Sequence, residues 1–272
     1  MTLPTLFDLS GKVAVITGGY GVLGGSMADA LAGAGARIAM LGRRRDAAEA
    51  KARALRDRGA EAMVLVADVL DRDSLVRACD ELMTSWGQVD ILINAAGGNV
   101  QRALNDESSI FEVPIDAIDE VMDLNLKGSV VPTMVFGEVM ARRKRGAVIN
   151  ISSMAALSAL SGVLGYSMVK AGIDNFTRWM AVEMARNFGD GIRVNAIAPG
   201  FFVSEQNRAV LMKPDGSFTD RARTIIAQTP MGRFGSPSEL DGAAIFLCSD
   251  AASFVTGTVI AVDGGFSVFS GV

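Results

Sequence analysis

The chain has 272 residues, half of them apolar, which is enough material for one sizeable core or for two smaller ones. Its charged residues are interspersed and sum to -4, so no basic face for nucleic acid or a membrane surface stands out. The sequence has no histidine, which excludes Ser-His-Asp and Cys-His catalysis and metal sites that need imidazole. We expect a small-molecule partner and no metal, although a site made of carboxylates alone stays open.

The sequence shows no targeting or membrane signal. No apolar stretch approaches the roughly 18 residues that span a bilayer. Met1 to Lys12 lacks the basic start, apolar run and cleavage site of a secretory signal, so we expect a cytoplasmic protein. Cys79 and Cys248 fall in predicted amphipathic helices, and we expect both to be buried apolar residues.

Seven short apolar runs predict β-strands. Because each run is continuous rather than alternating, both faces of the sheet should be covered by helices. The predicted class is a doubly wound, Rossmann-like α/β fold with a seven-stranded parallel sheet. The runs are Val13–Thr17, Arg37–Leu41, Ala62–Ala67, Ile91–Asn94, Ala147–Ile151, Ile192–Ile197 and Thr258–Val262.

Helical periodicity fills the segments between these runs. Leu23, Met27 and Leu31, for example, recur at the spacing of an amphipathic crossover helix. No linker or repeat interrupts the series, so we expect a single domain over residues 1–272. Residues 201–236 lack a clear strand and are interpreted as a substrate loop or lid that contains a helix, with a turn at residues 213–216.

A glycine-rich turn follows the first predicted strand and opens a helix. Unpaired backbone N–H groups and the positive end of a helix meet there, as binding of a nucleotide pyrophosphate requires. A tight turn that needs positive φ is the alternative interpretation. The turn runs Thr17-Gly18-Gly19-Tyr20-Gly21-Val22-Leu23-Gly24.

The end of the second strand bears on the choice of cofactor. Gly42 stands where a carboxylate would accept the 2′-hydroxyl of the adenosine ribose, and Arg43 follows it. Arginine suits a 2′-phosphate, so we expect NADP, with NAD as the alternative. A solvated basic start of a helix would explain the same residues.

Two further segments end strands at the same edge of the sheet, where open α/β proteins bind ligands. Asp68 and Val69 follow the third strand, and Asn94-Ala95-Ala96-Gly97 follows the fourth. Asp68 could equally be a helix N-cap, or serve both purposes.

Tyr166 and Lys170 are four residues apart in a helical pattern and share one helix face. An ammonium about 4 Å from a phenol could lower the phenol pKa by about 2 to 3 units. Ser153, just past the fifth strand, brings a hydroxyl to the same sheet edge. We expect the three side chains to converge, whereas the Tyr-Lys spacing alone would fit a helix surface.

From Asp8 to Val272 the chain resembles a classical short-chain dehydrogenase/reductase, a family of NAD(P)-dependent enzymes that interconvert ketones and secondary alcohols. The motifs occur in family order. They are the glycine-rich turn, Asn94-Ala95-Ala96-Gly97, Asn125, the set of Ser153, Tyr166 and Lys170, Pro199-Gly200, and Val262-Asp263-Gly264-Gly265.

The resemblance implies a role for each catalytic residue. Tyr166 would exchange the proton, Ser153 would hydrogen-bond the substrate carbonyl, and Lys170 would lower the pKa of the tyrosine and hold the nicotinamide ribose. Asn125 would position a water for proton relay, or else would be a hydrogen-bonding residue at a helix kink.

The resemblance also implies that Ile197-Ala198-Pro199-Gly200 and Ser204 receive the nicotinamide, although Ser204 could instead cap a helix. One departure is Val22, which replaces a family glycine while Gly21 stands where many NADP-binding members have a basic residue. The expected cofactor residues are Gly18, Tyr20, Gly21, Val22, Leu23, Gly24, Arg43, Asp68, Val69, Asn94, Ala95, Gly97, Tyr166, Lys170, Pro199, Gly200 and Ser204.

Within the family, several stretches of the chain resemble the D-mannonate oxidoreductase, or fructuronate reductase, branch. This similarity rests on residues 19–24, 96–99 and 198–208 and on the ending Val262–Ser267. Positions expected to face the substrate depart from the branch, which weakens the expected recognition of sugar hydroxyls. There, Val100-Gln101 replaces a His-Pro pair, and Ala155 and Gly162 replace polar residues.

The expected substrate is a small hydroxylated carboxylic acid, such as fructuronate or mannonate. Arg208 or Arg233 would bind its carboxylate through paired hydrogen bonds, and Asn99 or Gln206 would contact its hydroxyls. Another ketone, including a 3-oxoacyl one, is the first alternative.

A non-catalytic nucleotide sensor is the second alternative, against which the intact catalytic set argues. By family analogy, we expect a homotetramer built through the helices near Asn125 and Tyr166.

Overall fold

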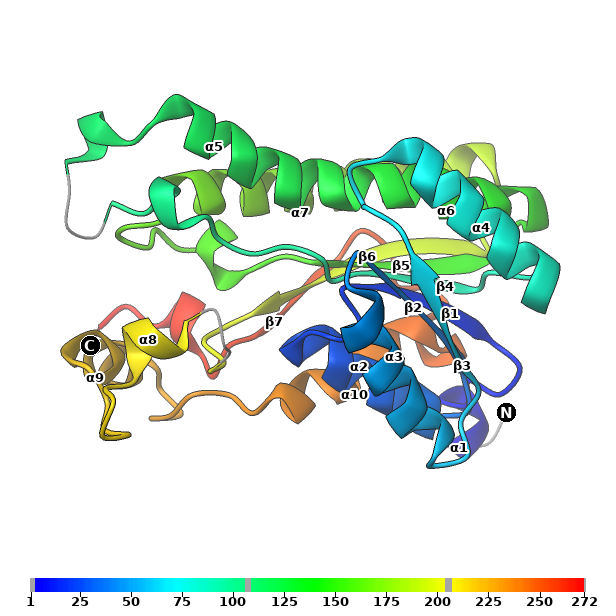
Figure 1. The fold of residues 1–272 in the computed structure, drawn as a ribbon, viewed down its shortest axis with the longest axis horizontal. Coiled ribbons are helices and arrows are strands. Elements are labelled where there is room, and N and C mark those ends of the chain that lie inside the picture. The colour runs from blue at the N-terminus through cyan, green and yellow to red at the C-terminus, as the bar shows by residue number, and fades with distance from the viewer. Residues whose placement is uncertain (1–2, 106–108, 204–206, 272) are drawn as a thin grey trace.

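A seven-stranded parallel sheet forms the middle layer of the computed structural model, which describes residues 3–105, 109–203 and 207–271 (Figure 1). The strands are β1 (Val13–Thr17), β2 (Arg37–Gly42), β3 (Ala62–Val66), β4 (Ile91–Asn94), β5 (Gly146–Ile151), β6 (Ile192–Pro199) and β7 (Val259–Val262). Their order is β3-β2-β1-β4-β5-β6-β7. This is the predicted doubly wound, Rossmann-like arrangement, and all seven predicted strands are confirmed.

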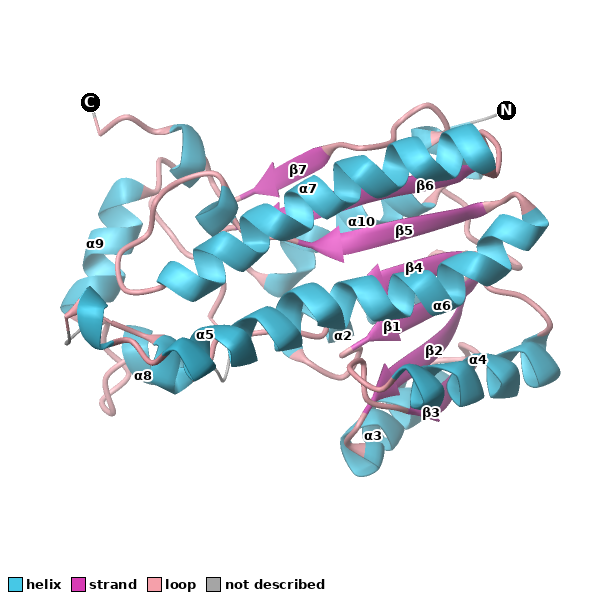
Figure 2. Cartoon of the chain, turned by 90° about the horizontal axis from the view of Figure 1, so that it is seen from above, coloured by secondary structure: helices cyan, strands magenta, loops and turns pink. Residues whose placement is uncertain are grey.

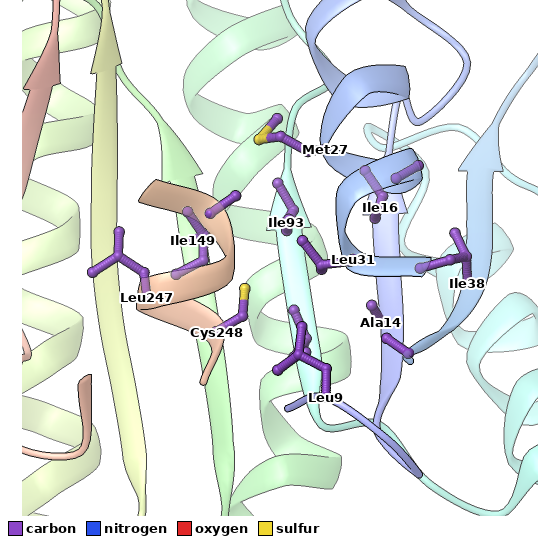
Figure 3. Packing of buried hydrophobic residues seen from close by; sticks show 14 of the residues in the cluster. Leu9, Ala14, Ile16, Met27, Leu31, Ile38, Ile93, Ile149, Leu247 and Cys248 are labelled. Atoms are coloured by element: carbon purple, nitrogen blue, oxygen red, sulfur yellow. The ribbon is translucent and has the colours of Figure 1, made fainter. Parts of the chain in front are cut away.

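Helices cover both faces of the sheet, which explains why the strands are apolar without alternation. Within β1, Ile16 points toward one group of helices and Val15 toward the other. Figure 3 shows Leu31 and Leu247 packed on the same side of the sheet as Ile16. One face carries α2 (Val22–Gly33), α3 (Arg45–Arg56) and α10 (Asp241–Cys248), and the other carries α4 (Arg72–Trp86), α6 (Gly128–Arg143) and α7 (Leu164–Asn187) (Figure 1).

Four buried polar side chains join the middle of the sheet to two helices. Asn94 on β4 donates through its amide to Thr133 on α6 and to Asn150 on β5, each at 2.8 Å. Asn150 in turn donates to Thr177 on α7 at 2.9 Å. Because water is excluded there, this polar ladder fixes α6 and α7 relative to the strand ends.

The carboxyl ends of the strands face a layer of shorter helices. Figure 2 shows the arrowheads directed toward the end of the molecule where α8 (Arg208–Leu211) and α9 (Asp220–Gln228) lie. The segment 201–236 therefore contains two short helices. Its predicted turn is confirmed by a 2.9 Å hydrogen bond from the Gly216 N–H to the Lys213 carbonyl. Between α5 (Ile115–Met122) and α6, residues 123–127 form a π-helical stretch.

The remaining described elements are short. No helix in the described ranges is both long and apolar enough to cross a membrane. Cys79 and Cys248 are buried, as predicted, and burial raises the pKa values of their thiols to about 11 and about 12. The short elements are α1 (Leu3–Leu6) and the 3-10 turns Gln101–Ala103, Ile110–Glu112, Met154–Ala156, Pro237–Leu240, Asp250–Ala252 and Phe266–Val268.

Candidate active site

A cleft of about 440 Å³ opens at the carboxyl edge of the sheet. Its walls come from the glycine-rich turn, the ends of β4, β5 and β6, the first turns of α7, and α8 and α9. It includes the junction of β1 and β4, from which the sheet grows in opposite directions. Open α/β sheets bind nucleotides at such a junction, so the cleft joins the two sites that the sequence predicts separately.

The glycine-rich turn brings the start of α2 to the wall of the cleft. Gly18 has a φ of 64°, and a Cβ atom on Gly24 would lie 2.6 Å from the Gly18 carbonyl oxygen. Only glycine fits at position 24, so the helix can begin directly over the turn. Gly21, the N-cap, offers no side chain to the first N–H groups of the helix. Val22 lines the cleft beside these glycines and leaves the arrangement intact.

Tyr20 packs against the end of β2, and this contact accounts for Gly42. A Cβ atom on Gly42 would lie 2.5 Å from the Tyr20 ring, so a side chain at the strand end would require the ring to move. The guanidinium of Arg44 lies over the same ring, 5.0 Å from its centre. Arg44 lines the cleft. The predicted residue, Arg43, instead forms a 3.7 Å ion pair with Asp68, and its side chain is 71% exposed.

Three other residues predicted to bind the cofactor, Asp68, Val69 and Asn94, contact other parts of the protein and are not among the described residues that line the cleft. Asp68 accepts a 3.0 Å bond from the Leu70 N–H. The N-cap of α4 is Asp71, which lies directly before the helix, so the N-cap interpretation of Asp68 is wrong. Val69 is buried in the core, and Asn94 belongs to the polar ladder. By contrast, the walls of the cleft include Ala95, Gly97, Pro199 and Gly200.

Ser153, Tyr166 and Lys170 all line the cleft, as their pattern predicts. Ser153 follows β5 and caps a 3-10 turn by accepting a 3.1 Å bond from the Ala155 N–H. Burial raises the pKa of Tyr166, and a hydrogen bond with Ser153 opposes the rise. The two hydroxyl groups therefore interact with each other at the wall of the cleft.

Lys170 is buried one turn further along α7. Its Nζ lies 5.3 Å from the centre of the Tyr166 ring and donates a 2.8 Å bond to the Ile151 carbonyl. Burial lowers the pKa of Lys170 to about 8, and the charge of Asp174 opposes the shift. Burial moves the pKa of Tyr166 in the opposite direction to the effect expected of Lys170, so the lowering by the ammonium stays a prediction.

Asn125 holds the loop after β4. Its Oδ1 accepts a 3.0 Å bond from the Gly98 N–H, and its Nδ2 donates to the carbonyls of Gly98 and Val121 at 2.8 and 2.9 Å. The residue is fully buried within the π-helical stretch. The geometry favours its interpretation as a hydrogen-bonding residue at a helix irregularity, because the side chain is committed to backbone groups. Its role in a water relay stays a prediction.

Beyond Tyr166, the cleft is mostly apolar with a few polar side chains. Asn99 lines it, as the sequence predicts. Gln101, which stands at a position expected to face the substrate, also lines it. Asn207 and Arg221 line it too, although neither was among the predicted substrate residues. The available signal was helical spacing, since Arg221 and the apolar Ile225 are one turn apart on α9.

The two arginines predicted to bind a substrate carboxylate lie elsewhere. Arg208 is exposed and is not part of the described cleft wall. Arg233 donates to both carboxylate oxygens of Glu239, at 2.7 and 2.6 Å, in a separate cavity of about 360 Å³ beside β7. This pairing lowers the pKa of Glu239 to about 2. Ser204 and Gln206 lie outside the described residues.

The residues of the cleft fit a nicotinamide dinucleotide. The start of α2 suits a pyrophosphate, because its first N–H groups point outward at the positive end of the helix. Arg44 stands at one end of this wall, and Pro199 and Gly200 stand toward Tyr166. Across the described ranges, no group of three or more acidic or cysteine side chains could hold a metal ion.

Comparisons with known proteins agree with this geometry. Residues 21–267 match the family model described as enoyl-(acyl carrier protein) reductase. The chain is 43% identical over 280 residues to the uncharacterized oxidoreductase UxuB of Bacillus subtilis, covering 99% of this chain and 100% of that protein.

Two solved structures are similar over nearly their whole length. One is a protein from Haemophilus influenzae, provisionally assigned as a D-mannonate oxidoreductase and solved with bound NAD. It has a TM-score of 0.92 and 40% identity, with 100% of both chains covered. The other is a gluconate 5-dehydrogenase from Burkholderia cenocepacia, in complex with NADP and tartrate. It has a TM-score of 0.87 and 33% identity, with 98% of this chain and 99% of that chain covered.

Proposed function

This chain belongs to the short-chain dehydrogenase/reductase family and is an NAD(P)-dependent oxidoreductase, and from this premise we propose that it interconverts the ketone and the secondary alcohol of a sugar acid. The observation that carries the proposal is the hydrogen-bonded pair of Ser153 and Tyr166 above the buried Lys170, at the wall of one cleft. Relatives named for D-mannonate and gluconate support the substrate class, as does the tartrate held by one of them.

The catalytic set is suited to moving one proton at the substrate oxygen. When bound, the reduced nicotinamide supplies the hydride that reaches the carbonyl carbon. The Tyr166 hydroxyl gives its proton to the carbonyl oxygen during reduction and takes it back during oxidation. Ser153 donates a hydrogen bond to the same oxygen and keeps it within reach of Tyr166.

Lys170 acts through its fixed position. Its bond to the Ile151 carbonyl holds the ammonium beneath the Tyr166 ring, at the wall that would receive the nicotinamide ribose. A positive charge at this place favours the phenolate that forms when Tyr166 gives up its proton. We assign to Asn125 the task of holding the Gly98 loop, which forms part of the cleft wall.

The proposed cofactor is NADP(H), with NAD(H) as the alternative. The charge of Arg44 at the adenosine end supports a 2′-phosphate. Packing also explains why position 42 carries no carboxylate, because the Tyr20 ring occupies the space beside Gly42. A similar protein was solved with NAD and another with NADP, so the preference is a property to be measured.

A substrate panel tests this function directly. D-mannonate, D-gluconate and simple secondary alcohols would be oxidised with NADP and NAD at one protein concentration, and fructuronate and simple ketones would be reduced with NADPH and NADH. We expect the largest kcat/KM with a sugar acid. Efficient turnover of simple ketones together with no measurable turnover of any sugar acid would remove the substrate assignment and leave the oxidoreductase class.

We also propose that the protein is a homotetramer built through α5, α6 and α7. Large apolar side chains are exposed on this side, including Ile115 at 72%, Met134 at 59% and Trp179 at 61%. Light scattering after gel filtration should give four times the chain mass. A monomer at micromolar concentration would contradict the proposal.

A further inference from the structure

We infer that Asp174 on α7 is a positioning residue for the reaction, and that it keeps the ammonium of Lys170 charged from one helical turn away. Asp174 is not among the described residues that line the cleft, so it acts through Lys170 and not on the substrate. The inference rests on the catalytic roles proposed above for Tyr166 and Lys170, and it is independent of the sugar-acid assignment.

The position of Asp174 follows from the face of α7 that packs on β5. Asp174 comes four residues after Lys170 and shares its helix face. On this face, Lys170 donates to the Ile151 carbonyl at 2.8 Å, and Thr177 accepts a 2.9 Å bond from Asn150. Asp174 lies between these two contacts along the helix and is only 3% exposed. The carboxylate is therefore held inside the protein, one turn behind the ammonium.

The burial of this carboxylate is costly, because its hydrogen bonding is incomplete. Oδ1 of Asp174 has no hydrogen-bond partner within residues 3–105, 109–203 and 207–271. Burial raises the pKa of Asp174, and the nearby Ser152 hydroxyl and the charges of Arg178 and Lys170 oppose the rise. Within the same ranges, the Ser152 hydroxyl forms no hydrogen bond of normal geometry. Asparagine has nearly the same shape and no charge to bury, so packing alone does not account for an acid at position 174.

The charge of Asp174 acts on a residue of the catalytic set. Burial lowers the pKa of Lys170 to about 8, and the charge of Asp174 opposes this shift. With a pKa of about 8, most Lys170 side chains hold their proton at neutral pH, whereas a further fall would leave many of them neutral. The proposed role of Lys170 beneath the Tyr166 ring requires the positive charge. Asp174 thus preserves the charge that favours the phenolate.

No other charged group in the described part of the chain acts on Lys170. Arg178, which acts on Asp174, is exposed and positive, so it does not favour the charged form of Lys170. The elements packed on α7 are β5, β6, α5, α6, the π-helical stretch and the 3-10 turn Met154–Ala156. Their ionisable side chains are Asp116, Asp119, Glu120, Asp123, Lys127, Glu138, Arg142, Arg143 and Arg193.

These ionisable side chains are directed elsewhere. Most are exposed, and Asp123 is half-buried and pairs with Lys127. Arg193 is buried and donates to the carbonyls of Leu247 and Ser249. None of them adds a charge that acts on Lys170 or Asp174. Removal of the Asp174 charge should therefore reach Lys170 without compensation.

Reduction of a ketone isolates the charge of Lys170, because Tyr166 and Lys170 both hold their protons when the reaction starts. Asp174→Asn and Asp174→Ser remove the carboxylate charge, and Asp174→Glu keeps it. The control is Glu183→Gln, which removes a carboxylate of the same helix about 20 Å from Lys170. We would measure kcat/KM from pH 6 to pH 9.5 at saturating NADPH, with fructuronate or, if it is not reduced, the best simple ketone of the panel.

We expect the alkaline fall of kcat/KM to begin about 1 pH unit lower in Asp174→Asn and Asp174→Ser than in the wild type. This shift corresponds to a loss of about fivefold at pH 8 and of less than about twofold at pH 6. Asp174→Glu and Glu183→Gln should follow the wild type within about 0.5 unit. A merely structural role of Asp174 would lower kcat/KM by the same factor at every pH.

Unfolding of the cofactor-free protein measures the same charge without a substrate. The quantity is the difference in urea midpoint between each protein and the same protein carrying Lys170→Met. In the wild type this difference should rise above pH 8, because the pKa of Lys170 is about 8 when folded and 10.5 when unfolded. In the Asp174→Asn background the rise should begin about 1 pH unit lower.

An unshifted onset in the neutral variants, in both kinetics and unfolding, would overturn the inference. So would an equal shift in Asp174→Glu, because packing and not charge would then be responsible. If Asp174→Asn folds poorly, Asp174→Ser provides the same comparison. A shifted onset in unfolding, together with a wild-type kcat/KM that does not fall at alkaline pH, would instead contradict the catalytic role proposed for Lys170.

Discussion

The ammonium of Lys170 lies 5.3 Å from the centre of the Tyr166 ring, one helical turn away on α7. Its hydrogen bond goes to the Ile151 carbonyl and not to the phenol, so the two side chains have separate tasks. Tyr166 shares a hydrogen bond with Ser153 and carries the exchangeable proton, and Lys170 provides a fixed charge beneath it.

Replacement of Tyr166 by Phe should therefore remove catalysis and spare binding. The change deletes only the hydroxyl, and the ring can still pack over Lys170. We expect kcat to fall by about 10³-fold, within the range for loss of a general acid, and the Kd of the cofactor to change by less than about threefold. Steady-state kinetics and a fluorescence titration would measure both. Near wild-type turnover would refute the proton-transfer role, and Lys170→Ala should impair both properties.

The buried Lys170 should also make stability depend on pH. Its pKa is lowered from 10.5 to about 8, so between these values the unfolded chain holds a proton that the folded protein has released. Stability from this group therefore rises with pH across that window and is lowest below pH 8. Relative to Lys170→Met, the wild type should gain about 2 to 3 kcal/mol in unfolding free energy between pH 7 and pH 10.

Urea unfolding of both proteins at several pH values would measure this difference. A constant difference across the window would show that the pKa of Lys170 is not lowered.

Asn125 should matter for both stability and turnover. Asn125→Leu would leave the N–H and carbonyl of Gly98 and the carbonyl of Val121 without their partner. The Val121 carbonyl is buried, whereas Gly98 lines the cleft, where water can replace the lost partner, so we expect a loss of about 1 to 3 kcal/mol. We also expect a lower kcat, because the Gly98 loop forms a wall of the cleft.

The control for Asn125 is Ser129→Ala on α6. The Ser129 hydroxyl donates a 2.8 Å hydrogen bond to the backbone carbonyl of Asn125. This bond does not involve the Asn125 side chain, which is the part that holds the Gly98 loop. We expect a loss of about 1 kcal/mol and a kcat within about twofold of wild type. If the control lowered kcat as much as Asn125→Leu, a specific effect on the loop would be excluded.

Arg44 should contribute more than Arg43 to the preference for NADPH. Arg44 lines the cleft over the Tyr20 ring, whereas Arg43 is exposed beside Asp68. We expect Arg44→Ala to lower the ratio of kcat/KM with NADPH to that with NADH by about tenfold, and Arg43→Ala to lower it by no more than about threefold. Equal use of NADH by the wild type, or a larger effect at Arg43, would contradict this assignment.

Gly42 provides a separate test of the packing beside the cofactor. Gly42→Ala should destabilise the protein by about 1 to 3 kcal/mol, because the new Cβ atom would lie 2.5 Å from the Tyr20 ring. Combining it with Tyr20→Ala should recover most of that loss relative to Tyr20→Ala alone. Additive effects in thermal unfolding would mean that Tyr20 is not what requires glycine at position 42.

The features that the sequence predicts correctly are those that follow from strand position. Continuous apolar runs gave the seven strands, and parallel strands bring their carboxyl ends to one edge. Ser153 follows β5 and reaches Tyr166 and Lys170 for that reason. The spacing of these two residues on α7 required no knowledge of the tertiary structure.

The choice among arginines required that knowledge. Arg233 is six residues from Glu239, and only the turn between them shows that they form a bidentate pair. Arg221 and Arg223 lie on one short helix, and its rotation alone decides which side chain meets the cleft. For the neighbouring residues Arg43 and Arg44, the sequence likewise does not show which one lines the cleft. The position of the Tyr20 ring, over which Arg44 lies, decides this.

The polar ladder of Asn94, Thr133, Asn150 and Thr177 has an evolutionary consequence. Loss of one amide would strand its buried partner at a cost of about 1 to 3 kcal/mol, whereas loss of two partners to apolar residues of similar shape is nearly neutral. Among related sequences, we therefore expect a substitution at one of these positions to be accompanied by a substitution at its hydrogen-bond partner. Asn94 and Asn150 lie on neighbouring strands far apart in the gene, and they should covary as one inherited unit.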